Sequence, residues 1–137
     1  MTLLKTAAFS LALAPAISSA ADRVGDFSLL DQDGYNHSMS WLDDHKAVAL
    51  LVQANDSAAT EAAVPAFAAL KAEYDAKGVE FLMINPMGKN NRAEVKSMLA
   101  EYGVEIPVLM DDARLISVAL GIAHTGSWCV FNPRTFP

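Results

Sequence analysis

Two apolar runs on either side of a helical pattern constrain the fold of this chain more than any other feature. Residues 47–52 are apolar on both faces, and residues 79–84 are apolar apart from Glu80, which is typical of strands buried in the middle of a sheet. Between them, apolar residues recur at helical spacing and predict a helix over residues 57–77, which Gly78 ends. A strand, a helix and a second strand in this order predict a crossover between parallel strands, and therefore an α/β fold.

The rest of the chain alternates strand and helix signals in the same way. Asp33-Gly34 is a strong turn between two short stretches and predicts a hairpin near the N-terminus. Further elements are expected at residues 95–102 (helix), 106–110 (strand), 115–120 (helix) and 128–131 (strand). The pattern predicts a sheet with helices on both faces, and the length of 137 residues suits one domain.

The first 21 residues are a different kind of sequence. Lys5 is the only charge before Asp22, an apolar run over residues 7–17 follows it, and small residues occupy positions 18–21. This pattern predicts a signal peptide, and the apolar run is too short to span a bilayer comfortably. We therefore expect an exported protein of residues 22–137, periplasmic or extracellular and of bacterial origin, with no membrane attachment after cleavage.

Charge and composition exclude several functions. The formal net charge of −6, with no basic cluster, argues against nucleic acid as a partner. The three histidines, His37, His45 and His124, show no metal-ligand spacing, so we expect neither a metal nor another cofactor. Cys129 is the single cysteine, so the core must hold without an internal disulfide. Its place between Trp128 and Val130 predicts a buried, inert thiol, although a relocated reactive thiol is an alternative.

Three segments, taken in order, carry a resemblance to a known family. They are V-G-D-F-S-L from Val24, K-G-V-E-F from Lys77, and Y-G-V-E-I-P-V-L from Tyr102. Together they resemble the redoxin branch of the thioredoxin superfamily, which includes peroxiredoxin-like (AhpC/TSA-like) and TlpA-like proteins. The resemblance covers residues 24–137. It implies a thioredoxin-like sheet with an N-terminal hairpin extension, and a family of thiol-disulfide oxidoreductases and peroxiredoxins.

The same resemblance locates the redox turn, where this chain departs from the family. Family members often carry C-x-x-C at the start of the helix after the central strand, where the helix dipole stabilises a thiolate. A helix-kinking proline follows eight residues after the first cysteine. Pro65 stands eight residues after Ser57, which places Ser57 and Thr60 at the two cysteine positions. A hydroxyl cannot form a disulfide, so Ser57 is expected to act only as a helix cap, shared with Asp56.

Two other family landmarks are absent by the same comparison. The resemblance places Thr125 and Gly126 on the Thr and Pro of the family's cis-proline loop, which faces the redox turn, so the proline is replaced by glycine. Family members also continue with one more strand and a C-terminal helix after the strand at residues 128–131. We therefore expect residues 22–137 to be a redoxin domain that is incomplete at its C-terminus.

Two functions of different class remain open from the sequence. The first is a non-catalytic binding or assembly module of a larger exported protein, whose partner is another protein or a fused downstream module. The second is a thiol oxidoreductase or antioxidant protein that acts through Cys129 or through a partner's thiol. Thiol chemistry distinguishes them, because only the second needs a reactive Cys129.

Overall fold

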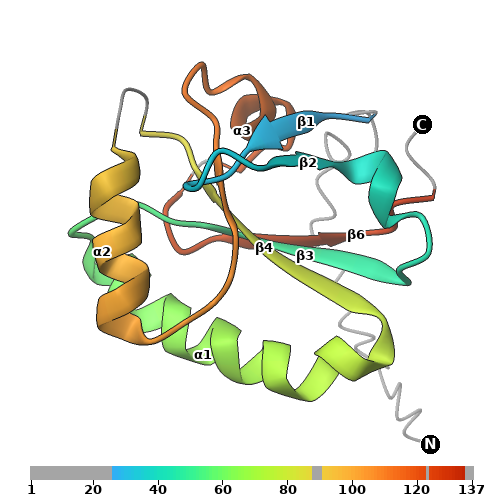
Figure 1. The fold of residues 1–137 in the computed structure, drawn as a ribbon, viewed down its shortest axis with the longest axis horizontal. Coiled ribbons are helices and arrows are strands. Elements are labelled where there is room, and N and C mark those ends of the chain that lie inside the picture. Colours follow the sequence, from blue (N-terminus) through green and yellow to red (C-terminus); the bar gives the residue numbers. More distant parts are fainter. Residues whose placement is uncertain (1–25, 88–90, 123, 135–137) are drawn as a thin grey trace, which may run out of the picture.

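The computed structural model describes residues 26–87, 91–122 and 124–134. They form a four-stranded sheet with helices on both faces and a two-stranded hairpin laid over one face (Figure 1). The predicted signal peptide, residues 1–21, lies outside the described residues and stays a prediction.

A mixed sheet forms the centre of the domain. In sheet order its strands are β5 (Val108–Met110), β4 (Val79–Asn85), β3 (Ala47–Val52) and β6 (Trp128–Phe131). β3 and β5 both pair with β4 in parallel, whereas β6 pairs with β3 in antiparallel fashion. The two predicted central strands are confirmed, since almost every residue of β3 and β4 is buried. β5 begins two residues later than predicted, after Pro107, which has no N–H to add to the ladder.

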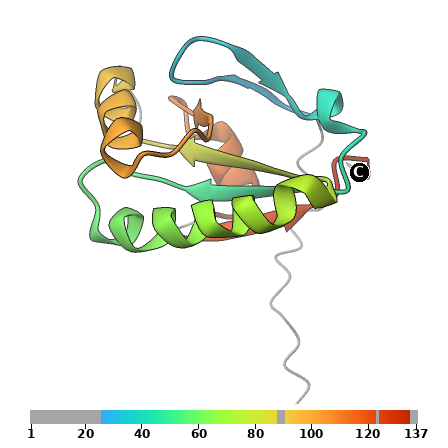
Figure 2. The same cartoon turned by 60° about the horizontal axis from the view of Figure 1, so that its bottom comes forward.

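Two helices pack on one face of the sheet, as Figure 2 shows for the longer one. They are α1 (Ala58–Tyr74) and α2 (Arg92–Tyr102), and their inner side chains form one core cluster with β3, β4 and β5. Within it the rings of Phe67 and Phe81 meet edge to face, with centroids 5.2 Å apart. A 3-10 turn, η3 (Asp75–Lys77), extends α1 to Gly78, whose φ of 87° ends the helical run as predicted.

The opposite face is covered by the hairpin and by short helical segments. These are β1 (Ser28–Leu30), β2 (Asn36–Ser38), the 3-10 turn η2 (Met39–Leu42) and α3 (Leu115–Ala119). They enclose a second core cluster that includes the fully buried side chains of Met39, Leu50 and Leu82. The predicted hairpin and the predicted helices on both faces are therefore confirmed.

A buried carboxylate organises the turn of the hairpin. Asp31 accepts hydrogen bonds from the backbone N–H groups of Asp33 and Tyr35 at 2.9 and 3.0 Å, and its other oxygen lies 2.7 Å from Nε2 of His37. Burial alone would raise the pKa of Asp31, but these hydrogen bonds, the one with His37 above all, bring it below its ordinary value. The carboxylate thus holds the turn closed.

Candidate functional site

The first turn of α1 follows β3 and a short polar loop, and it carries the two residues that the family resemblance singles out. Ser57 is the N-cap residue of α1, and Thr60 lies in the first helical turn. Pro65 lies inside α1, which continues past it. The structure therefore brings Ser57 and Thr60 together at the positive end of the longest helix, directly beyond the carboxyl end of a central strand.

The prediction that the side chains of Ser57 and Asp56 cap this helix is wrong. No side chain accepts a capping hydrogen bond at Ser57; the Ser57 carbonyl instead accepts the backbone N–H of Glu61 at 3.0 Å. Asp56 has a φ of 55°, in the left-handed region, and turns the chain from the loop into the helix. Glu61 places its negative charge in the first turn of α1, where the helix dipole favours it.

Thr60 has a structural partner of its own. Its side chain is only 2% exposed, and its hydroxyl oxygen accepts a hydrogen bond from the backbone N–H of Ala54 at 3.0 Å. This bond ties the loop that leaves β3 to the first turn of α1. The hydroxyl thus satisfies a backbone donor, which a sulfur atom would do less well.

The loop before β6 lies against the same helical turn. The N–H of Gly126 donates to the carbonyl of Val52 at 2.9 Å, at the end of β3. A Cβ built on Gly126 would lie 3.2 Å from the Cβ of Ala59, and φ at Gly126 is 85°. The left-handed φ therefore favours glycine at this point, and a side chain would also make a tight contact with α1. Thr125, next to it, is half-buried.

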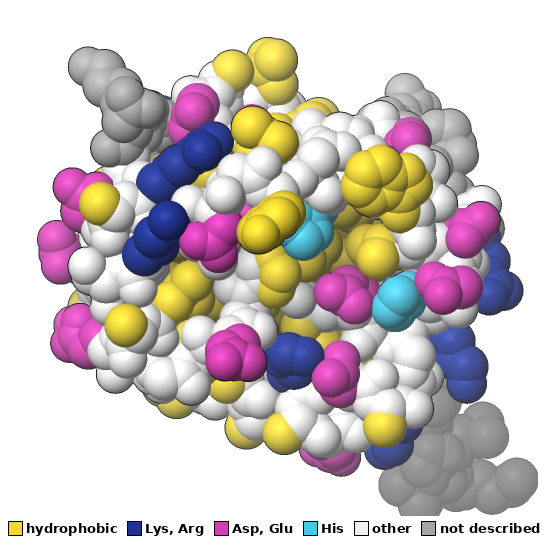
Figure 3. All heavy atoms as spheres, viewed as in Figure 1, with side chains coloured by type: hydrophobic (Ala, Val, Ile, Leu, Met, Phe, Trp, Pro, Cys, Tyr) yellow, Lys and Arg dark blue, Asp and Glu magenta, His cyan; other side chains and the backbone are white. Residues whose placement is uncertain are grey.

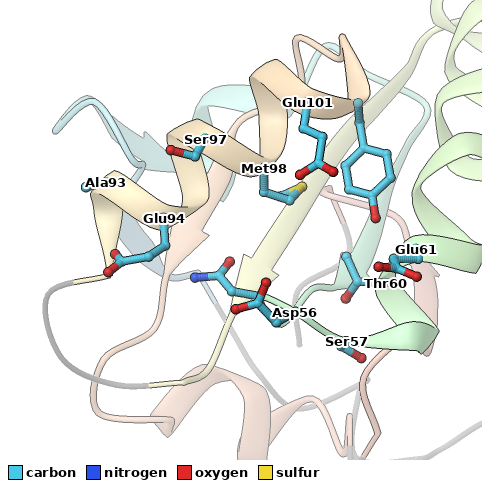
Figure 4. Close-up of a pocket in the computed structure, with 11 residues that line it drawn as sticks. Asp56, Ser57, Thr60, Glu61, Ala93, Glu94, Ser97, Met98 and Glu101 are labelled. Atoms are coloured by element: carbon cyan, nitrogen blue, oxygen red, sulfur yellow. The ribbon is translucent and has the colours of Figure 1, made fainter.

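A cavity of about 460 Å³ opens between the first turn of α1 and the side of α2 (Figure 4). Four carboxylates line it and no lysine or arginine does; the acidic residues are Asp56, Glu61, Glu94 and Glu101. Desolvation, together with the charges of Glu61 and Glu101, raises the pKa of Tyr102, which also lines the cavity. In Figure 3, acidic side chains, coloured magenta, also lie along the edge of the molecule where α2 is. The negative field around this turn disfavours a further anion.

A buried network of side-chain amides supports the turn from below. Gln53 and Asn85, which directly follow β3 and end β4, are fully buried, and Nδ2 of Asn85 donates to Oε1 of Gln53 at 2.7 Å. Nε2 of Gln53 donates in turn to Oδ1 of Asn55, also at 2.7 Å. Oδ1 of Asn85 accepts the backbone N–H of Met87 and Nδ2 of Asn91. Sequence reasoning missed this network, although a polar residue at the end of each apolar run was a visible signal.

Cys129 is not part of this site. Along β6, Trp128 contacts the core on the α1 side, whereas Cys129 packs against the cluster on the hairpin side. The thiol therefore lies on the other face of the sheet from the N-terminus of α1. The predicted burial holds only in part, because Cys129 is half-buried and Trp128 and Val130 are exposed. The reason is that β6 pairs only with β3 within the described residues.

We expect Cys129 to react slowly with alkylating reagents in the folded protein. Burial raises the pKa of the Cys129 thiol to about 11. Because the thiolate is the nucleophile, alkylation at pH 8 should be roughly two orders of magnitude slower in the folded protein than in denaturant, where the pKa is about 8.5. The chain has one cysteine, so the measured rate reports on this thiol alone. Equal rates in both conditions would contradict the placement of Cys129.

Neither a metal site nor a membrane helix emerges from the part of the chain that the structure describes. In residues 26–87, 91–122 and 124–134, no three His, Cys, Asp or Glu side chains converge so that they could hold a metal ion. Over the same ranges, no helix combines the length and apolar character needed to cross a bilayer.

The fold and the position of the site define the class of protein. A mixed sheet in the order β5-β4-β3-β6, with α1 leaving the carboxyl end of β3, is the thioredoxin-like arrangement. The sequence profile of the AhpC/TSA family matches residues 20–136, nearly the whole chain, and the protein belongs to this family. No curated protein matches the sequence of this chain.

Several solved structures share the fold at low sequence identity. A hypothetical protein from Sinorhizobium meliloti superimposes with a TM-score of 0.73 at 22% identity, over 82% of this chain and 64% of that one. An uncharacterized conserved protein from Geobacillus kaustophilus gives 0.72 at 21%, over 80% of this chain and 61% of that one. A secreted disulfide oxidoreductase of Mycobacterium tuberculosis, homologous to E. coli DsbE, gives 0.67 at 15%, over 79% and 77%. This chain thus spans less than two thirds of the first two proteins.

Proposed function

We propose that this protein is an exported, non-catalytic member of the redoxin family that serves as a binding or assembly module. The observation that carries the proposal is the first turn of α1, where hydroxyl side chains stand at both positions that the resemblance assigns to the redox cysteines. Its partner is another protein or a fused module, and its location is the periplasm or the extracellular space. The predicted signal peptide supports the location.

Three features of the site support a loss of redox chemistry rather than a displaced active site. Thr60 is committed to a structural hydrogen bond with Ala54. Four carboxylates line the cavity beside the turn, and their charge opposes the stabilisation of a thiolate by the helix dipole. Gly126 has a left-handed φ of 85° and lies close to Ala59, so a side chain at this position would be strained and tightly packed against α1. The turn is built as a stable loop–helix junction.

The alternative function, a thiol oxidoreductase that uses Cys129, rests on family membership. Two observations weigh against it. The Cys129 thiol has a pKa of about 11, so little thiolate is available near neutral pH. The thiol also lies across the sheet from the helix N-terminus that activates the family's cysteine. A reaction at Cys129 would need a partner that both lowers the pKa of this thiol and supplies the second thiol.

The test is an assay of the purified wild-type protein. We expect no reduction of insulin disulfides and no consumption of hydrogen peroxide above the rate of a Cys129→Ser variant. An active redoxin of the same family, assayed in parallel, is the positive control. Activity in the wild type that disappears in Cys129→Ser would overturn the proposal and establish the thiol oxidoreductase instead.

A further inference from the structure

Met87 lies just beyond β4 and contacts the loop that leads into α1. Its thioether sulfur accepts a hydrogen bond from the backbone N–H of Asn55 at 3.2 Å. Its own backbone N–H donates to Oδ1 of Asn85 at 2.9 Å. A thioether is a weak acceptor, so sulfur is an uncommon partner for a backbone donor. The side chain of Met87 therefore joins the loops that follow the two central strands, beside the first turn of α1.

The backbone next to Met87 is held from two further sides. Nε of Arg114, the residue before α3, donates to the carbonyl of Pro86 at 2.7 Å. Asn85 is fully buried, and its side chain donates to Gln53. These contacts fix the segment that carries the sulfur, so the fold itself places the sulfur against the N–H of Asn55.

Met87 is also the methionine most open to solvent among the residues that the structure describes. Its side chain is 44% exposed. The other methionines of these residues are buried, with exposed fractions between 0% and 7%: Met39, Met83, Met98 and Met110. Oxidation of a methionine needs contact between its sulfur and the oxidant, so the fold directs oxidation to Met87.

A thioether needs no deprotonation to react, and this separates Met87 from the single thiol of the chain. Thiol oxidation proceeds through the thiolate. Burial raises the pKa of the Cys129 thiol to about 11, so little thiolate exists near neutral pH. Among the described residues, Met87 is thus the sulfur most available to an oxidant.

We propose that Met87 is a modification site at which a hydroperoxide oxidises the thioether to a sulfoxide, and that this oxidation changes the hydrogen bond from Asn55. A sulfur lone pair attacks the terminal oxygen of the hydroperoxide, and an S–O bond forms as the O–O bond breaks. The sulfur gives up two electrons. The proton of the transferred hydroxyl passes to the leaving oxygen, which departs as water or an alcohol. Each protein consumes one peroxide in this step, so the modification is compatible with a protein that has no peroxidase activity.

Oxidation changes the polarity and the acceptor strength of the side chain that faces Asn55. A sulfoxide is polar, whereas a thioether is apolar. The sulfoxide oxygen is a stronger acceptor than the sulfur, so the N–H of Asn55 gains a better partner when the end of the side chain rotates. Asn55 also accepts a hydrogen bond from Gln53, and it lines the acidic cavity beside the first turn of α1. A peroxide therefore acts through Met87 on the loop that leads into the candidate site.

Peptide mapping by mass spectrometry after exposure to hydrogen peroxide tests the site, in a Cys129→Ser background so that no thiol competes. We expect Met87 to gain an oxygen at least about tenfold faster than any of the buried methionines. Met83 lies in the same tryptic peptide, so fragmentation of that peptide is needed to assign the oxygen. In denaturant the difference in rate should disappear.

Met98→Leu is the matched control for Met87→Leu. Met98 lines the acidic cavity, as Figure 4 shows, but only 7% of it is exposed. The fast oxidation should persist in Met98→Leu and should be lost in Met87→Leu.

The backbone amide of Asn55 tests the second part of the proposal. In heteronuclear NMR we expect the Asn55 N–H resonance to shift when Met87 is oxidised and its exchange with solvent to become slower. The N–H of Gly126, which donates to Val52 at the end of β3, should not change. In Met87→Leu, peroxide should leave the Asn55 resonance where it is. Oxidation of Met83 or Met98 as fast as that of Met87, or an Asn55 amide that does not respond to complete oxidation of Met87, would overturn the proposal, even if the protein proves to be non-catalytic.

Discussion

Replacing Ser57 and Thr60 by cysteine, in a Cys129→Ser background, is expected to give a redox-active dithiol in a protein that has none. The two side chains lie three residues apart in the first turn of α1, so a disulfide can close between them. In the reduced form the thiolate at position 57 attacks a substrate disulfide, and the thiol at position 60 resolves the mixed disulfide. Insulin reduction should rise from background to a readily measured rate.

The helix N-terminus and the surrounding carboxylates act on this new thiolate in opposite directions. The N-terminal dipole of α1 lowers the pKa of a thiol at position 57, whereas the four carboxylates of the cavity raise it. We expect the net pKa to lie below the ordinary value of about 8.5, because the carboxylates are open to solvent and therefore partly screened. Adding Glu61→Gln should lower the pKa further and speed the reaction.

Matched controls separate these effects. Glu105→Gln removes an exposed carboxylate away from the cavity and should leave the pKa of the new thiol unchanged. Ser57→Cys alone should form no internal disulfide and should not turn over. A pKa that stays at the ordinary value in the double variant would show that Ser57 is not at the redox position.

The substitution Thr60→Cys should also lower the free energy of unfolding by about 1 kcal/mol, because the hydrogen bond from the Ala54 N–H is weakened.

The central part of the fold could be predicted from the sequence because it follows from local patterns. Residues 47–52 are apolar on both faces and residues 79–84 are apolar apart from Glu80, and the helix between them has its own period, so the βαβ unit needed no knowledge of distant contacts. The hairpin followed from Asp33-Gly34 in the same way. Each of these elements is encoded within about 20 residues of continuous chain.

The surroundings of the site could not be predicted, because they depend on which elements become neighbours. The carboxylates Glu94 and Glu101 approach the first turn of α1 only because α2 packs beside α1. The exposure of Val130 follows from the place of β6 next to β3 alone, which an apolar strand sequence does not reveal. The predicted side-chain cap of α1 is a different case. Ser57 occupies the expected N-cap position, but its side chain makes no capping hydrogen bond.

The amide network beneath the turn depends on register in the same way, and it gives the largest stability effect that we expect. Gln53 and Asn85 are 32 residues apart, and they meet because Val52 pairs with Ile84 in the parallel ladder. A one-residue slip would separate them and would leave fully buried amides without partners. The bond between them therefore fixes the register of β3 against β4 as well as the loop that leads into α1.

Asn85→Ala is accordingly expected to lower the free energy of unfolding by about 3 kcal/mol, since the buried Oε1 acceptor of Gln53 loses its donor and the part-buried hydrogen bond from the backbone N–H of Met87 is lost as well. In a domain of this size such a loss lowers Tm by roughly 10 °C or more, which thermal unfolding would measure. Asn36→Ala, on the exposed hairpin, is the matched control and should change the free energy of unfolding by less than about 0.5 kcal/mol. If both variants unfold at the same temperature, the network does not fix the register. Gln53 links Asn85 to Asn55 in the loop at residues 54–57. If Asn85→Ala is destabilised and proteases also cleave this loop faster in the native state, the buried amides stabilise both the sheet and the turn.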